Sequence, residues 1–191
     1  MNPMITRAIH PARRHLFVPV FVLMAGCAES SVPAPDAVAE SSASSAREAE
    51  VIAVVEDFLE AISARDGATM EALSLPGGSV HSVALGDDGS LEGVNSRALA
   101  EDAARIPEAS DPLLERMWDP VAMVHGRLAM VWTPYDFWVD GEWSHCGVDA
   151  FTLVETDAGW RVSSISYTTE TSDCPESPLP PPSEGEPGVT G

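Results

Sequence analysis

The sequence has no lysine: all ten of its basic residues are arginines, and they stand against 30 aspartates and glutamates. The formal net charge of the 191 residues is −20. Removal of residues 1–26 would take away three arginines and no acid, leaving seven bases against 30 acids and a net charge of −23. A surface this acidic repels phosphate backbones and anionic lipid, so we exclude nucleic acid as a partner.

The sequence also lacks the short motifs of several enzyme classes. It contains no glycine-rich phosphate loop, no nucleophile elbow and no HExxH zinc motif. His81, His125 and His145 do not have the spacing of zinc ligands, either with one another or with the three cysteines. We therefore expect no bound metal and no cofactor.

The N-terminal apolar run is too short for a membrane-spanning helix, which needs about 20 residues. This run, "LFVPVFVLMAGC" (residues 16–27), follows a segment with three arginines and no acid and ends in small residues, as a secretory signal peptide does. Its end, "LMAGC", resembles a bacterial lipobox, which implies that Cys27 is lipidated and becomes the new N-terminus. The domain would then be anchored by lipid on the periplasmic or extracytoplasmic side of a bacterial cell envelope. The alternative is a plain signal peptide cleaved near Ala25.

Composition divides the rest of the chain into three parts. Residues 27–46 are rich in Ser, Ala and Pro without an apolar period, and we expect a flexible tether. Residues 175–191 are rich in proline and acidic, which predicts a disordered tail with local polyproline geometry at "PLPPP". Between them, residues 47–174 have the length of one domain, with residues 1–26 as the signal peptide.

The domain begins with helical patterns and ends with strand patterns, which predicts an α+β fold. Apolar residues at helical spacing form one stripe: Val51, Val55, Phe58, Leu59 and Ile62. We expect a short second helix before Pro76, a strand over 79–85 and a third helix over 96–105. After Pro112 several strand-like runs follow, and Asp140-Gly141 between two of them predicts a tight hairpin turn.

This order of elements resembles the nuclear transport factor 2-like superfamily. The segments that carry the resemblance are "RMWDP" (116–120), "AMVWTPYDFWVDGEWSHCGVDAF" (129–151) and "GWRVSSISYT" (159–168). They are most similar to its SnoaL-like and lumazine-binding-like bacterial branches. The resemblance implies about three N-terminal helices packed on a strongly curved antiparallel sheet, which form a cone with an open pocket. It also implies a homodimer through the open sheet face, and it covers both enzymes and non-catalytic binding modules, so the fold does not assign the function.

A two-residue turn at Asp140-Gly141 predicts the register of the hairpin and places Asp136 opposite His145. Because side chains alternate between the faces of a strand, each face receives its own set. One face would carry Trp132, Asp136, Trp138, His145, Asp149 and Phe151. The other face would carry Tyr135, Phe137, Cys146 and Val148.

Two interpretations of the first face remain open. If it lines the pocket, Asp136 would raise the pKa of His145, and a carboxylate among tryptophans would gain a raised pKa suited to a general base. If it faces solvent, Asp136 and His145 form a surface pair that stabilises the fold by less than about 1 kcal/mol. The site would then lie on the face of Tyr135, Phe137 and Cys146. We expect Glu115 to face water.

Cys146 and Cys174 are the two thiols left if Cys27 is lipidated. An oxidising compartment favours a disulfide between them. The chain after residue 169 would, however, have to fold back for the two to meet, so both the bridged and the unbridged state stay open.

The sequence therefore predicts a membrane-anchored lipoprotein whose pocket binds a small molecule or a partner without catalysis. Complete catalytic motifs are missing, which favours binding. The alternative is an isomerase, cyclase or hydrolase that uses Asp136 or Asp149 as general base with the assistance of His145.

Overall fold

The first element, α1 (Pro35–Ser63), opens the computed structural model, which describes residues 35–183 and their side chains from residue 43. Its predicted apolar stripe faces the core, with Val51 and Val55 fully inaccessible and Ile62 partly buried. The helix begins inside the segment that we expected to be a tether, because alanine stabilises a helix even where no apolar stripe marks it. The predicted signal peptide, Cys27 and residues 184–191 lie outside the described residues.

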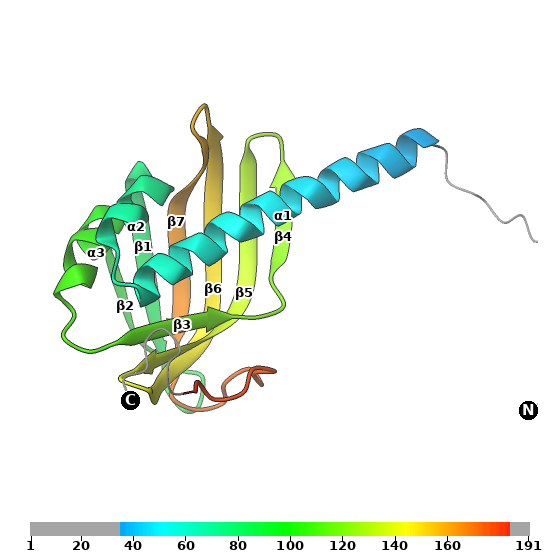
Figure 1. Ribbon diagram of the computed structural model, residues 1–191. Coiled ribbons are helices and arrows are strands. Elements are labelled where there is room, and N and C mark those ends of the chain that lie inside the picture. Colours follow the sequence, from blue (N-terminus) through cyan, green and yellow to red (C-terminus); the bar gives the residue numbers. More distant parts are fainter. Residues whose placement is uncertain (1–34, 184–191) are drawn as a thin grey trace, which may run out of the picture. The chain divides into compact units, whose positions relative to one another are not determined.

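Two shorter helices and seven strands follow α1 (Figure 1). In chain order they are α2 (Gly67–Leu73), β1 (Ser74–Leu85), β2 (Leu91–Ala98), α3 (Leu99–Arg105), β3 (Leu113–Met117), β4 (Val121–His125), β5 (Leu128–Val139), β6 (Glu142–Thr156) and β7 (Gly159–Thr169). The predicted third helix starts three residues late because residues 91–98 form β2, a strand that the sequence pattern did not indicate. None of the helices within residues 35–183 is long and apolar enough to cross a membrane.

The seven strands form one curved, unclosed sheet in the order β2-β1-β7-β6-β5-β3, with β4 also paired to β5. All pairs are antiparallel except β1 with β7, which is parallel. The sheet is therefore mixed, whereas the resemblance implied a purely antiparallel one. Figure 1 shows α1 crossing one face of this sheet, and the core lies between them. We call this face, which carries Val131 and Phe151, the inner face.

The hairpin of β5 and β6 turns at Asp140 and Gly141, and both residues have the positive φ that such a turn requires. The predicted pairing holds only for the first two pairs, because a β-bulge at Ser144 shifts the register by one residue. Phe137 then lies opposite His145, and Asp136 lies opposite Cys146. The predicted cross-strand pair of Asp136 and His145 is therefore wrong.

The chain after β7 differs from the predicted disordered tail. Cys146 and Cys174 form a disulfide, and the Arg116 Nη1 atom donates a hydrogen bond to the carbonyl oxygen of Pro180 at 2.7 Å. Residues 175–183 therefore lie against the sheet on the face opposite α1, which we call the outer face. They have no regular secondary structure there.

Candidate functional site

A cavity of about 360 Å³ lies between the inner face of the sheet and the helices. Most of its lining is apolar and comes from α1, α2, α3 and the central strands. The apolar side chains are Phe58, Leu59, Ile62, Met70, Val80, Leu99, Ile106, Phe137, Phe151 and Ile165. Such a lining around a few polar groups is typical of small-molecule sites.

Two acids form the most unusual polar group of the cavity. Glu115 comes from β3 and Asp149 from β6, and their carboxyl groups hydrogen-bond each other. One of the two must hold a proton to make that bond. Asp149 is only 2% exposed, and its Oδ2 atom has no hydrogen-bond partner among the described residues. The expectation that Glu115 faces water is thus wrong.

Burial sets the protonation of this pair. It raises the pKa of Glu115 to about 8, although the hydrogen bond with Asp149 pulls that pKa down and the charge of Asp136 adds to the rise. Burial and the neighbouring Glu115 raise the pKa of Asp149 well above its ordinary value. Asp149 therefore keeps its proton at neutral pH and donates it to Glu115, and the pair can both release and accept a proton close to neutrality.

His145 reaches the same cavity from β6. Its ring stacks on Phe137 at a centroid distance of 4.9 Å and meets the edge of Tyr135 at 5.8 Å. Its Nδ1 atom lies 3.1 Å from the Ser144 hydroxyl. Burial lowers the pKa of His145, so the ring is neutral at neutral pH. This is opposite to the rise that a partner Asp136 would have caused.

Tyr135 is buried beside His145, and its hydroxyl bonds to the backbone of another strand. The hydroxyl donates a hydrogen bond to the carbonyl oxygen of Thr168 on β7 at 2.7 Å. Burial raises the pKa of the phenol further above its ordinary value. Tyr135 therefore shapes the cavity and stays protonated.

A fixed cation borders the cavity near α3. Arg97, at the end of β2, forms an ion pair with Asp102 and donates a hydrogen bond to the Tyr167 hydroxyl at 3.1 Å. Burial lowers the pKa of Arg97, but the hydrogen bonds to Asp102 and Tyr167 outweigh it and raise the pKa. Arg105 adds a second bond to Asp102 at 2.9 Å, so two guanidinium groups share one carboxylate, and the remaining positive charge lies on the solvent-exposed Arg105.

Three predicted site residues lie on the outer face, away from the cavity. Asp136 accepts two hydrogen bonds from Arg116, at 2.9 and 2.7 Å, and both side chains are nearly buried. The Arg116 guanidinium lies 5.4 Å from the ring centre of Trp138. Trp132 is 54% exposed. Because a charge paired in this way is held in place, Asp136 has a structural role and is not available as a general base.

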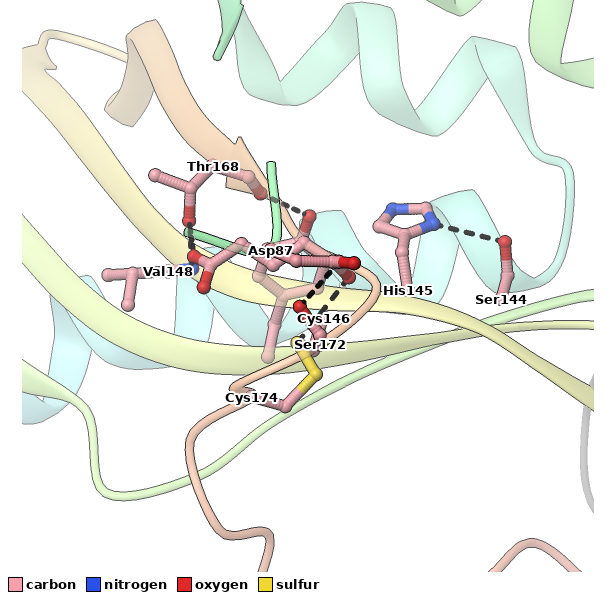
Figure 2. The surroundings of a disulfide bond; sticks show 10 residues. Asp87, Ser144, His145, Cys146, Val148, Thr168, Ser172 and Cys174 are labelled. Carbon is pink, nitrogen blue, oxygen red and sulfur yellow. Dashed lines mark hydrogen bonds between the residues drawn. A yellow bond between two sulfur atoms is a disulfide. The ribbon is translucent and has the colours of Figure 1, made fainter. Parts of the chain in front are cut away.

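Of the predicted residues, the structure brings His145, Asp149 and Phe151 into the cavity together with Tyr135 and Phe137. The cavity thus combines residues from both predicted faces of the hairpin: His145, Asp149 and Phe151 from the first, and Tyr135 and Phe137 from the second. Cys146 of the alternative face lies outside, where it forms the disulfide with Cys174 (Figure 2). In Figure 2 the His145 ring and the disulfide stand on opposite sides of β6.

Sequence reasoning missed Glu115, Arg97, Asp102 and Tyr167. Glu115 and Asp149 are 34 residues apart in a chain with 30 acids, so nothing local marks them as a pair. Arg97 carries no signal because the strand that presents it was not predicted. The pairing of β3 with β5 puts Glu115 opposite Phe137, and knowledge of this register would have placed Glu115 in the cavity.

The fold is similar to solved structures of low sequence identity. A protein described as NTF2-like with a cystatin-like fold, from Novosphingobium aromaticivorans, matches with a TM-score of 0.56 and 14% identity over 73% of this chain and 92% of its own. A suggested dehydratase of the NTF2-like family from Streptomyces avermitilis has a TM-score of 0.55 and 19% identity over 67% of this chain and 99% of its own. An NTF2-like superfamily protein from Salmonella enterica matches with a TM-score of 0.54 and 14% identity over 68% of this chain and 94% of its own.

No protein-family model matches the sequence, and no curated protein matches it. At these identities, the structural likeness shows the fold alone. The function has to be argued from the cavity.

Proposed function

Because the domain has the nuclear transport factor 2-like fold with its cystatin-like arrangement of helices on a curved sheet, we propose that it binds a small, largely apolar molecule in the cavity of its inner face, without catalysis. The observation that carries this proposal is the apolar cavity of about 360 Å³ with a single protonated carboxyl pair in its wall. Its volume lies within the range of about 300–1,000 Å³ of small-molecule sites.

The polar groups indicate what kind of molecule fits. The acid pair is mostly neutral at neutral pH, Asp102 compensates the buried charge of Arg97, and the second guanidinium, that of Arg105, is exposed to solvent. A charged ligand would find no free partner among these groups and would lose its hydration. A neutral ligand with a carbonyl, ether or hydroxyl oxygen could accept a hydrogen bond from the acid pair. We therefore propose a neutral, oxygen-bearing apolar molecule.

Binding of a neutral apolar dye tests the cavity directly. We expect N-phenyl-1-naphthylamine to gain fluorescence with the wild-type protein and to saturate. Ile62→Trp, which fills the cavity, should weaken this binding at least tenfold, whereas Val121→Trp on the outer face of β4 should not change it. Absence of saturable binding, or equal binding in both variants, would refute the proposal.

Mass spectrometry of the protein purified from its host under native conditions can then identify the natural ligand. We expect Glu115→Leu, which leaves no hydrogen-bonding group at this position, to lose the bound molecule and Glu142→Gln, at the exposed hairpin turn, to keep it.

Acid–base catalysis is the second candidate, and the pKa of about 8 of Glu115 is the observation that favours it. A general acid or base works best when its pKa lies near the working pH. In this alternative Asp149 and Glu115 exchange protons with the substrate, and the neutral His145 assists. Incubation of the identified ligand with wild type and Asp149→Asn separates the two functions, since only an enzyme converts it and only the wild type would do so.

We further propose that the domain is held to a bacterial envelope by lipid on Cys27. The signal-peptide pattern and the lipobox-like "LMAGC" support this location. Two or more acyl chains suffice for stable anchoring, so no charge attraction is required.

A further inference from the structure

Residues 175–183, which we call the strap, have the composition of a proline-recognition ligand. Five of these nine residues are prolines: Pro175, Pro178, Pro180, Pro181 and Pro182. Proline carbonyls accept hydrogen bonds, proline nitrogens donate none, and the chain prefers the extended polyproline geometry. A surface that binds such a segment needs aromatic faces and hydrogen-bond donors.

The outer face of the sheet offers both beneath the strap. The side chains of Trp118, Trp138 and Trp143 line the space between sheet and strap together with the Arg116–Asp136 ion pair. We call these five residues the tryptophan groove. Arg116 fixes one strap carbonyl through its hydrogen bond to Pro180. The Trp138 Nε1 atom is buried without a hydrogen-bond partner in the described part of the chain, so one more donor stands ready for a carbonyl.

The strap fits this groove loosely. A space of about 420 Å³ remains between the two, and it is lined by groove residues on one side and by strap residues such as Pro175, Leu179 and Pro181 on the other. Loose packing of this kind forgoes much of the dispersion and burial energy of a closed contact. The covalent bond between Cys146 and Cys174 therefore holds the strap at its start (Figure 2).

We propose that the tryptophan groove is a binding site for proline-rich polypeptide segments, that the strap occupies it within the same chain, and that reduction of the Cys146–Cys174 disulfide frees it for such a segment of another chain. Cys174 is the partly exposed cysteine of the bridge, and Cys146 is 1% exposed. The reductant is a protein dithiol. It gives two electrons and two protons to the disulfide, becomes a disulfide itself, and leaves Cys146 and Cys174 as thiols.

Cleavage by a glutamate-specific protease tests whether the disulfide keeps the strap docked. Glu176 is exposed within the strap, and a docked strap resists the protease because cleavage needs several residues of free chain. In the oxidised wild type we expect slow cleavage after Glu176, read by mass spectrometry. Reduction by a dithiol, or Cys174→Ser without reductant, should accelerate it at least tenfold. Rapid cleavage of the oxidised protein, or unchanged protection after reduction, would overturn the proposal.

Peptide binding tests the groove. The probe is a fluorescent peptide with the strap sequence PESPLPPPS, and the full-length receptor carries Cys174→Ser with Pro178, Pro180, Pro181 and Pro182 changed to serine, so that its own strap no longer competes. We expect saturable binding there and none to the oxidised wild type. Adding Trp143→Ala should weaken it at least tenfold, whereas adding Trp132→Ala, on the same face outside the groove, should not.

A peptide with serine in place of its prolines should fail to bind the same receptor. If the receptor does not bind the proline peptide, or if Trp143→Ala and Trp132→Ala act alike, the groove is not a proline-recognition site. Dye binding in the inner cavity is independent of both results, so this proposal and the proposed ligand site can fail separately.

Discussion

Glu115 and Asp149 show how one buried hydrogen bond sets the chemistry of a site. Each acid would be costly to bury as a carboxylate, so both hold their protons at neutral pH. The structure thus places a neutral donor and acceptor in an otherwise apolar wall. A water-exposed pair of the same residues would be ionised at neutral pH and would repel apolar ligands.

The raised pKa of Glu115 predicts a pH dependence of stability. Between its ordinary value of 4.5 and about 8, the folded state holds a proton that the unfolded state has lost. This contribution to the free energy of unfolding is therefore complete below pH 4.5 and is lost as the pH rises to 8, by at most about 1.4 kcal/mol per pH unit. In Glu115→Gln the loss of stability with pH should be smaller than in the wild type, since only the raised pKa of Asp149 still contributes to it.

Urea unfolding at pH 5, 6.5 and 8 measures the effect. Glu142→Gln, an exposed acid on the same sheet, is the control and should keep the wild-type slope. Equal slopes in wild type and Glu115→Gln would show that Glu115 ionises freely.

His145 should titrate below its ordinary pKa of 6.5, because burial disfavours the charged ring and no carboxylate in the described structure stands beside it to compensate. Asp136→Asn should leave this titration unchanged, since Asp136 binds Arg116 on the other face. An NMR titration of the ring protons in both proteins decides the matter. A pKa above 6.5 that falls in the variant would restore the cross-strand pair.

The sequence could predict part of the site because strand alternation is regular, and it failed where one residue interrupts that regularity. Asp149 and Phe151 share a face with His145 in the predicted and in the observed hairpin, because all three lie on one side of the bulge. Asp136 lies on the neighbouring strand β5, whose register against β6 is shifted by one residue at the bulge, and it therefore changes faces relative to them. A bulge at Ser144 has no signal in the sequence, since serine is common at any strand position.

At the scale of elements, local patterns predicted the pieces and long-range contacts decided their limits. The apolar stripe of α1 and the turn at Asp140-Gly141 are confirmed, because both depend on neighbouring residues. β2 could not be predicted, because its eight residues are mostly polar or small and are stabilised by pairing with β1. The docking of residues 175–183 depends on a disulfide partner 28 residues away.

At Gly147 the backbone of Thr168 lies so near to β6 that there is no room for a side chain. A Cβ atom there would lie 2.2 Å from the carbonyl oxygen of Thr168, the same oxygen that accepts the Tyr135 hydrogen bond. We expect Gly147→Ala to lower the free energy of unfolding by about 1–3 kcal/mol, because backbone has to move. Gly93→Ala has open space around it and should change stability little. Denaturant unfolding of both variants tests this, and equal stabilities would show that the strands can separate without cost.

At the scale of the whole molecule, its acidic charge and its proposed anchor belong together. The proposed cleavage before Cys27 would leave a net charge of −23, which anionic lipid repels, so in this proposal the lipid on Cys27 supplies the attachment. Cys27→Ser should therefore move the protein from the membrane to the soluble fraction of a bacterial host. Cys174→Ser, which changes a different cysteine, should leave it in the membrane. Retention of Cys27→Ser in membranes would exclude a lipid anchor.

The parallel pairing of β1 with β7 has a consequence for the order of events during synthesis. β1 is the first strand to leave the ribosome, and β7, with which it pairs on the side away from β2, is the last. Val80 meets Ile165, so half of the ladder of β1 cannot form until nearly the whole domain has been made. The growing chain can close the later hairpins one by one, but it cannot complete its sheet. A nascent chain of this topology therefore remains incompletely folded until translation is almost over.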